Sequence, residues 1–202
     1  MTKQAQSIDY KVLNRIYGHR GGWVFTPAHF LDLGSRTAIA AALKRHKKAG
    51  VIRQLDRGLY DYPIDHPTLG RIAPSADAVA RALARRDAVR LQPTGAYAAN
   101  ILGLSEQVPT RIEFLTDGPS RRVKFGQQEI VLKGTTPRNM ATAGRKSGTI
   151  VQALRHIGQR HVNDRTLAIL KRQLTKKDRE QLLKDLRYAP VWIAEILRTL
   201  AA

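Results

Sequence analysis

The segment LGSRTAIAAALKRHKKAG, Leu33–Gly50, combines hydrogen-bond donors and small residues at helical spacing. On a helix, Arg36, Thr37 and Lys44 fall on the same side as Ala41. Arginine can donate two parallel hydrogen bonds to guanine, threonine can contact a thymine methyl group, and alanine lets a helix approach base edges closely. These residue types in this pattern are typical of a helix that reads bases in the major groove, which is about 12 Å wide.

The flanking residues predict where this helix begins, ends and packs. Ser35 is a favourable N-cap, and Gly50 stands where helices commonly end in a left-handed conformation. The first turn after Ser35 has free amides that can accept a phosphate, and the basic last turn, which includes Lys48, complements the helix dipole. The opposite face is expected to pack on the core through Ile39, Ala42, Leu43 and His46.

A shorter helix is predicted just upstream, in the stretch WVFTPAHFLDLG. We expect Thr26 to cap it, Pro27 to occupy its first position, and Phe30 and Leu31 to face inward. The sequence DLG favours a tight turn between the two helices. This arrangement predicts a helix-turn-helix.

The stretch VIRQLDRGLYDYP follows directly and predicts a β-hairpin with DRG at its turn. Gly58 suits a backbone position with positive φ. Arg57 would then stand at the tip, where it could reach a phosphate or the minor groove. A hairpin after the second helix predicts a winged helix-turn-helix domain over residues 1–66. Its candidate DNA-binding residues are Ser35, Arg36, Thr37, Ala41, Lys44, Lys48 and Arg57.

The composition agrees with a polyanionic partner. The chain has 202 residues, a formal net charge of +19 and no cysteine. A charge this large favours binding to nucleic acid or to an acidic membrane surface, and the absence of cysteine excludes disulfides and cysteine-based metal sites. The first residues have no apolar signal-peptide core, and no window approaches the roughly 20 apolar residues of a membrane span. We therefore expect a cytoplasmic protein that does not insert into a membrane.

Two stretches of the chain resemble a known family. LGSRTAIAAALKRHKKAGVIRQLDRGLYDYP is similar to the N-terminal winged helix of abortive-infection antitoxins of the AbiEi type, and RGLY, Arg57 to Tyr60, is its most recognisable piece. RLQPTGAYAANILGLSEQVPTRIEFLTDGPSRRVKFGQQEIVLKGTTPRNM resembles the following domain in a related group of small proteins of unknown function. The resemblance extends over roughly residues 10–195.

This resemblance implies a bacterial antitoxin that is also a transcriptional autorepressor. Such proteins bind inverted repeats in their own promoter through the winged helix. A palindromic operator usually needs two copies of such a domain, through a homodimer or two monomers side by side. Their second domain counters a nucleotidyltransferase-like toxin, in many cases without stable binding. Carried over to this chain, the DNA contacts would include Arg36, Thr37, Lys44 and Arg57.

Residues 67–202 predict a second domain of α+β class, after a linker rich in proline and turn formers at residues 61–74. The alternating segments Arg111–Leu115, Arg122–Phe125 and Glu129–Lys133 predict three strands, which we expect to form an antiparallel meander. A succession of basic helices is expected from about residue 137 to the last residue. Ser75, Asn163 and Thr175 are expected to cap helices.

The second domain contains no clear catalytic constellation. Glu113, Asp117, Glu129 and Lys133 lie on or near strands but lack the Glu-x-Lys spacing and the paired acid of a metal-dependent nuclease. We therefore expect no enzyme activity, metal or cofactor. Candidate phosphate contacts are Arg138, Arg145 and Lys146. An RNA-binding protein or nuclease that acts through this basic domain, and a module that binds a toxin directly, remain alternatives.

Overall fold

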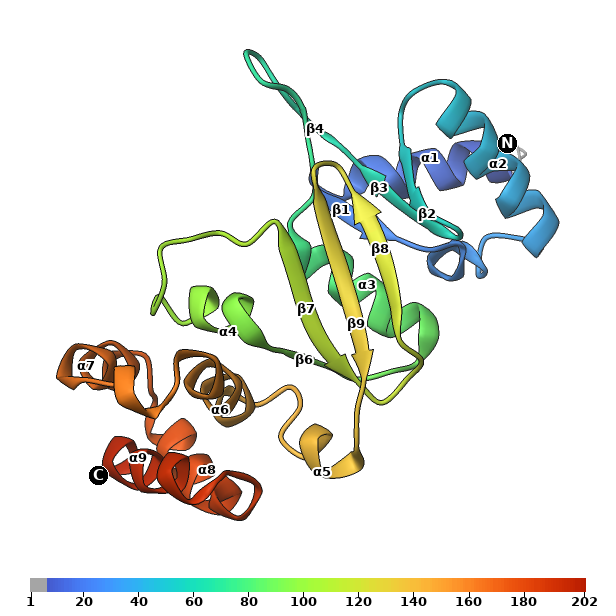
Figure 1. Cartoon of the computed structure of the whole chain (residues 1–202). Helices are drawn as coiled ribbons and strands as arrows, with labels where there is room; N and C mark the ends of the chain where they lie inside the picture. The colour runs from blue at the N-terminus through green and yellow to red at the C-terminus, as the bar shows by residue number, and fades with distance from the viewer. Residues whose placement is uncertain (1–6) are drawn as a thin grey trace. The chain divides into compact units, whose positions relative to one another are not determined.

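A computed structural model describes residues 7–202 as a mixed α+β protein with two compact units (Figure 1). The first unit runs to Ala88 and includes the strand tip Lys124–Gln127. The second comprises Val89–Val123 and Gln128–Ala202. The first unit thus extends past the boundary expected at residue 66, and residues 1–6, where the predicted first domain begins, lie outside the described residues.

From residue 7 to residue 88, the first unit contains three α-helices, a short 3-10 helix and two small antiparallel sheets. The elements of this unit are, in chain order, α1 (Ile8–Gly18), β1 (Trp23–Phe25), η1 (Pro27–Phe30), α2 (Arg36–Lys48), β2 (Arg53–Asp56), β3 (Leu59–Tyr62), β4 (Ile64–His66), β5 (Gly70–Ile72) and α3 (Ala76–Asp87). The three-stranded sheet has the order β1-β3-β2.

One apolar core holds α1, η1 and α2 against the sheet. It is built from Val12, Ile16, Phe25, Phe30, Ile39, Ala42, Leu43 and Ile52. The expectation for Phe30 is confirmed, but Leu31 is 40% exposed rather than inward-facing. The reason is that η1 is a single 3-10 turn ending at Phe30, so Leu31 lies beyond the part of the helix that packs on the core.

The linker predicted over residues 61–74 is wrong in part, because β4 and β5 form a hairpin there. Most of the hairpin is exposed, so an alternating apolar pattern could not have revealed it. Arg53 secures it: the guanidinium donates to the carbonyl of Ile72 at 2.7 Å and to the carboxylate of Asp61. Asp61 is completely buried, and a buried charge requires a partner; the guanidinium of Arg53 provides it.

The second unit combines a mixed four-stranded sheet with a cluster of helices. The strand order is β6-β7-β9-β8. Its elements are β6 (Leu91–Pro93), α4 (Gly95–Ile101), β7 (Arg111–Thr116), β8 (Arg121–Phe125), β9 (Gln128–Gly134), α5 (Pro137–Met140), α6 (Lys146–Ile157), η2 (Gln159–His161), α7 (Asp164–Arg172), α8 (Lys176–Asp185), η3 (Leu186–Tyr188) and α9 (Val191–Ala201).

The predicted strands exist, but their antiparallel meander is wrong. β7 pairs with β9 in parallel, from Arg111 opposite Glu129 to Thr116 opposite Gly134, and β8 is an edge strand. The burial patterns explain this order. Three consecutive residues, 130–132, are buried in β9, as in a strand covered on both faces, whereas burial in β8 alternates near its end.

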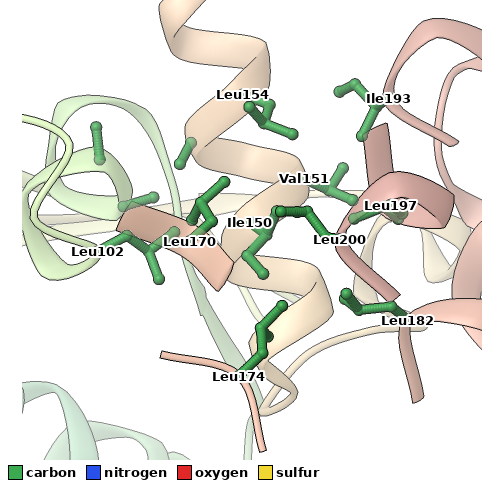
Figure 2. Close-up of a cluster of buried hydrophobic side chains, with 13 residues drawn as sticks. Leu102, Ile150, Val151, Leu154, Leu170, Leu174, Leu182, Ile193, Leu197 and Leu200 are labelled. Atoms are coloured by element: carbon green, nitrogen blue, oxygen red, sulfur yellow. The ribbon is translucent and has the colours of Figure 1, made fainter. Parts of the chain in front are cut away.

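The helices of the second unit pack around α6. Figure 2 shows Ile150, Val151 and Leu154 of α6 among leucines and isoleucines of the neighbouring helices. The buried cluster also includes Leu102, Leu170, Leu174, Leu182, Ile193, Leu197 and Leu200. The predicted caps Ser75, Asn163 and Thr175 are confirmed by side-chain hydrogen bonds to the first turns of α3, α7 and α8.

Candidate nucleic-acid interface

The helix α2 begins and ends where its sequence predicts. The hydroxyl of Ser35 accepts a hydrogen bond from the amide of Ala38 at 3.3 Å. The helix ends at the C-cap Ala49, and Gly50 then adopts φ +73°. The predicted inner face is confirmed, because Ile39, Ala42, Leu43 and His46 are all buried.

The opposite face of α2 is exposed to solvent. It carries the candidates Arg36, Thr37, Ala41, Lys44 and Lys48, together with Ala40. Within residues 7–202, no hydrogen bond or ion pair involves the side chains of Arg36, Lys44 and Lys48. Their charged groups are therefore available to an external partner. Thr37 makes a short-range contact, with its hydroxyl 3.0 Å from that of Ser35.

The other basic residues near the end of α2 are engaged within the unit. Arg45 forms an ion pair with Asp9 at 2.8 Å, and Lys47 donates to the side-chain carbonyl of Gln54 at 2.9 Å. His46 is buried, with Nε2 3.3 Å from the carbonyl oxygen of Asp9. The basic cluster RHKK thus separates into side chains with internal contacts and one, Lys48, without a partner among the described residues.

The turn between β2 and β3 presents Arg57 to solvent. Gly58 has φ +68°, which an L-residue adopts only with strain. The carbonyl of Arg57 accepts a hydrogen bond from Arg86 of α3 at 2.6 Å, and Arg86 also pairs with Asp56 at 3.2 Å. Arg86 is a positioning residue for this turn that sequence reasoning missed, since nothing in a helical spacing indicates a contact with a hairpin about 30 residues upstream.

The three basic candidates of the second unit have different surroundings. Arg138 is exposed. Arg145 pairs with the buried carboxylate of Asp185 at 2.6 Å, and the hydroxyl of Ser147 donates to the same carboxylate at 2.5 Å. Lys146 pairs with Asp178 at 3.0 Å and donates to the carbonyl of Gln173 at 2.5 Å. Arg145 and Lys146 therefore link α6 to α8 and to the turn before it.

Two of the three acidic residues considered for a nuclease form internal pairs. Glu113 of β7 pairs with Lys133 of β9 at 2.8 Å, and Asp117 pairs with Arg90 at 2.8 Å. Arg90 lowers the pKa of Asp117 through hydrogen bonds from its side chain and backbone amide. Within the described part of the chain, no group of three or more histidine, aspartate or glutamate residues could hold a metal ion.

Comparison with protein families identifies the family of this chain. Residues 11–182 match the family of unknown function DUF6088, and the chain belongs to it. A comparison with curated proteins found no match. Among solved structures, the chain is similar to the crystal structure of RV2827C protein from Mycobacterium tuberculosis. The identity is 17% and the TM-score 0.48, over 96% of this chain and 77% of that one.

Across residues 7–202, no helix combines the length and apolar character needed to cross a membrane.

Proposed function

We propose that the first unit is a winged helix-turn-helix that binds double-stranded DNA in a sequence-dependent manner. In this assignment η1 and α2 are the two helices of the motif, and α2 enters the major groove. The hairpin formed by β2 and β3 is the wing. The order of helices and strands and the sheet β1-β3-β2 support this assignment.

The observation that carries the proposal is the exposed face of α2. Ala40 and Ala41 keep this face narrow, so its backbone can approach base edges. Arg36 stands in the first turn, where its guanidinium can donate to O6 and N7 of guanine. Lys44 and Lys48 follow along the helix, and Arg57 projects from the hairpin, so each can neutralise a phosphate.

The sequence resemblance to AbiEi-type antitoxins supports a more specific role. We propose a transcriptional autorepressor that binds inverted repeats upstream of its own gene and acts as the antitoxin of a nucleotidyltransferase-like toxin in the cytoplasm. Since inverted repeats present the same half-site twice, two copies of the chain would bind each operator. In this role the chain acts by binding DNA and is not an enzyme.

The test is binding of the full chain to the DNA upstream of its gene and to a scrambled duplex, over a range of salt concentrations. A protein of charge +19 binds any duplex at low salt, so only the ratio of the two affinities is informative. We expect a preference for the upstream DNA that persists at high salt. We expect Arg36→Ala to reduce that preference about 10- to 100-fold, as for the loss of one bidentate base contact.

Arg165→Ala is the matched control, because it removes one exposed arginine from α7 of the second unit. We expect it to leave the preference for the upstream DNA unchanged. Equal affinity of the wild-type chain for both duplexes at every salt concentration would contradict the proposal. It would direct the search to RNA and to protein partners of the second unit.

A further inference from the structure

Two adjoining hollows of the first unit lie beside η1 and α3. The first, about 200 Å³ in volume, is lined by Trp23, His29, Arg81 and Arg85 among others. The second, about 420 Å³, is lined by Pro27, His29, Arg85, Arg86 and the turn residue Gly58. The larger volume falls within the roughly 300–1,000 Å³ of typical ligand sites. His29 and Arg85 line both hollows and therefore mark their junction.

The cations at this junction are not neutralised by the wall of the hollows. Arg85 is exposed and has no hydrogen bond or ion pair with any residue in the range 7–202. Among the described residues, Arg81 makes a single distant contact, with Asp77 on its own helix at 3.6 Å. None of the described residues that line the two hollows is acidic. Arg85 therefore differs from Arg86, whose guanidinium pairs with the carboxylates of Asp56 and Asp87.

His29 adds an imidazole ring to the lining of both hollows beside Arg85. Its Nδ1 lies 3.2 Å from the backbone nitrogen, the hydroxyl oxygen and the carbonyl oxygen of Thr26, so these contacts hold the ring in place at the junction. Partial burial lowers the pKa of His29, a hydrogen bond with the backbone of Thr26 opposes this shift, and the nearby charges of Arg85, His19 and Arg15 lower the pKa further. A bound anion would raise the pKa of His29.

We propose that the junction of these hollows is a binding site for a phosphate group, contacted by Arg85 and His29 and attracted by Arg81. Arginine suits this ligand because its planar guanidinium can donate two parallel hydrogen bonds to phosphate oxygens. Pro27 and Ala28 supply an apolar wall beside the charged groups. The phosphate could belong to the DNA backbone near the β2–β3 turn or to a small phosphate ester, and the chemistry of the contact is the same.

The experiment follows the histidine Cε1–H signals of the full chain by NMR during titration with inorganic phosphate. The ionic strength is held constant with chloride, so that general screening does not change. The signal of His29 is assigned by its loss in His29→Asn. We expect a saturable shift of this signal and a rise in the pKa of His29, whereas His66, His156 and His161 remain unshifted.

The variant Arg85→Gln tests the contact directly. Because it removes a charge-assisted hydrogen bond, we expect the affinity for phosphate to fall at least about tenfold. Arg165→Gln is the matched control and should leave the titration unchanged. Equal behaviour of wild type and Arg85→Gln would overturn the proposal, as would shifts of all histidines in proportion, which indicate adsorption to a basic surface.

A second titration identifies the source of the phosphate. If a DNA phosphate occupies the site, a duplex will shift the His29 signal of wild type but not of Arg85→Gln, and inorganic phosphate will compete. If inorganic phosphate shifts the signal and a bound duplex does not, the ligand is a small phosphate-bearing molecule. The phosphate titration contains no DNA, so its result is independent of the proposal that α2 reads bases.

Discussion

Basic side chains of α2 and those at the start of α6 are of the same types, arginine and lysine, but differ in whether they have a partner within the chain. On α2, Arg36 and Lys44 face solvent without a partner among the described residues. At the start of α6, Arg145 and Lys146 pair with Asp185 and Asp178 of α8. Arg36 and Lys44 can therefore bind a partner outside the chain, whereas Arg145 and Lys146 hold α6 and α8 together.

This difference shows that net charge alone does not locate a binding surface. Each pair at the start of α6 joins residues more than 30 positions apart, so helical spacing cannot reveal it. Asp185 is 2% exposed, and a carboxylate buried to this extent requires a cation or hydrogen-bond donors. Basic side chains that pair with such carboxylates are structural. The basic side chains without an internal partner are the candidates for nucleic-acid contact.

The largest effect is expected at Arg145. In Arg145→Ala, the buried carboxylate of Asp185 retains one side-chain hydrogen bond from the described residues, that of Ser147, and an uncompensated buried charge is costly. The guanidinium is 45% exposed, which reduces the loss, so we expect the free energy of opening of α8 to fall by about 2–3 kcal/mol. Hydrogen exchange of the α6 and α8 amides in the full chain measures it.

Arg165→Ala provides the comparison, since an exposed side chain without a partner should change stability by less than about 0.5 kcal/mol. Preference for the upstream DNA should be unchanged in Arg145→Ala. Similar hydrogen exchange in the two variants would show that the pair of Arg145 with Asp185 does not stabilise α8.

A smaller effect is expected from the pH dependence of the capping box of α8. The pKa of Asp178 is lowered to about 2 by the backbone amide of Thr175, then by the hydroxyl of Thr175 and by Lys146. Since the folded pKa lies below the unfolded value, this contribution is present above about pH 4 and is lost as the pH falls toward 2. The side chain is 25% exposed, so solvent screening keeps the loss near 1 kcal/mol.

The measurement is hydrogen exchange of the α8 amides between pH 6 and pH 2, corrected for the intrinsic exchange rate. Asp178→Asn removes the titrating group, so its stability should depend less on pH than that of wild type over this range. Identical pH profiles would mean that Asp178 does not contribute through its charge.

Local sequence signals predicted much of the fold. Capping residues and helical spacing placed α2 from Arg36 to Lys48, together with its buried face, because both depend on contacts within a few residues. Alternation and turn residues placed β7, β8 and β9 within one or two residues of their ends. The strand order was not predicted, because pairing β7 with β9 depends on which strand is covered on both faces.

The candidate site was predicted only in part. Residues on the surface of α2 follow from the helix itself, so the exposure of Arg36, Thr37, Ala41 and Lys44 is confirmed. The groups from α3 were not predicted, because Arg85 and Arg86 approach η1 and the hairpin only through the tertiary fold. Their signal in the sequence, two arginines near the end of an amphipathic helix, is common at helix ends that complement the dipole.

The smallest effects separate two neighbours on α2. Lys44 has no partner in residues 7–202, whereas Arg45 pairs with Asp9 on a surface where both side chains are partly exposed. Exposed pairs stabilise by about 0.2–1 kcal/mol, so Arg45→Ala should destabilise the first unit slightly. Lys44→Ala should leave stability unchanged but reduce the slope of log affinity for DNA against log salt by about 1, because one phosphate contact is lost. Paired denaturation and salt titrations of both variants measure the two quantities. If Lys44→Ala and Arg45→Ala reduced this slope equally, an internal ion pair would not prevent a basic side chain from contacting DNA. The distinction between structural and DNA-binding cations would then not hold on α2.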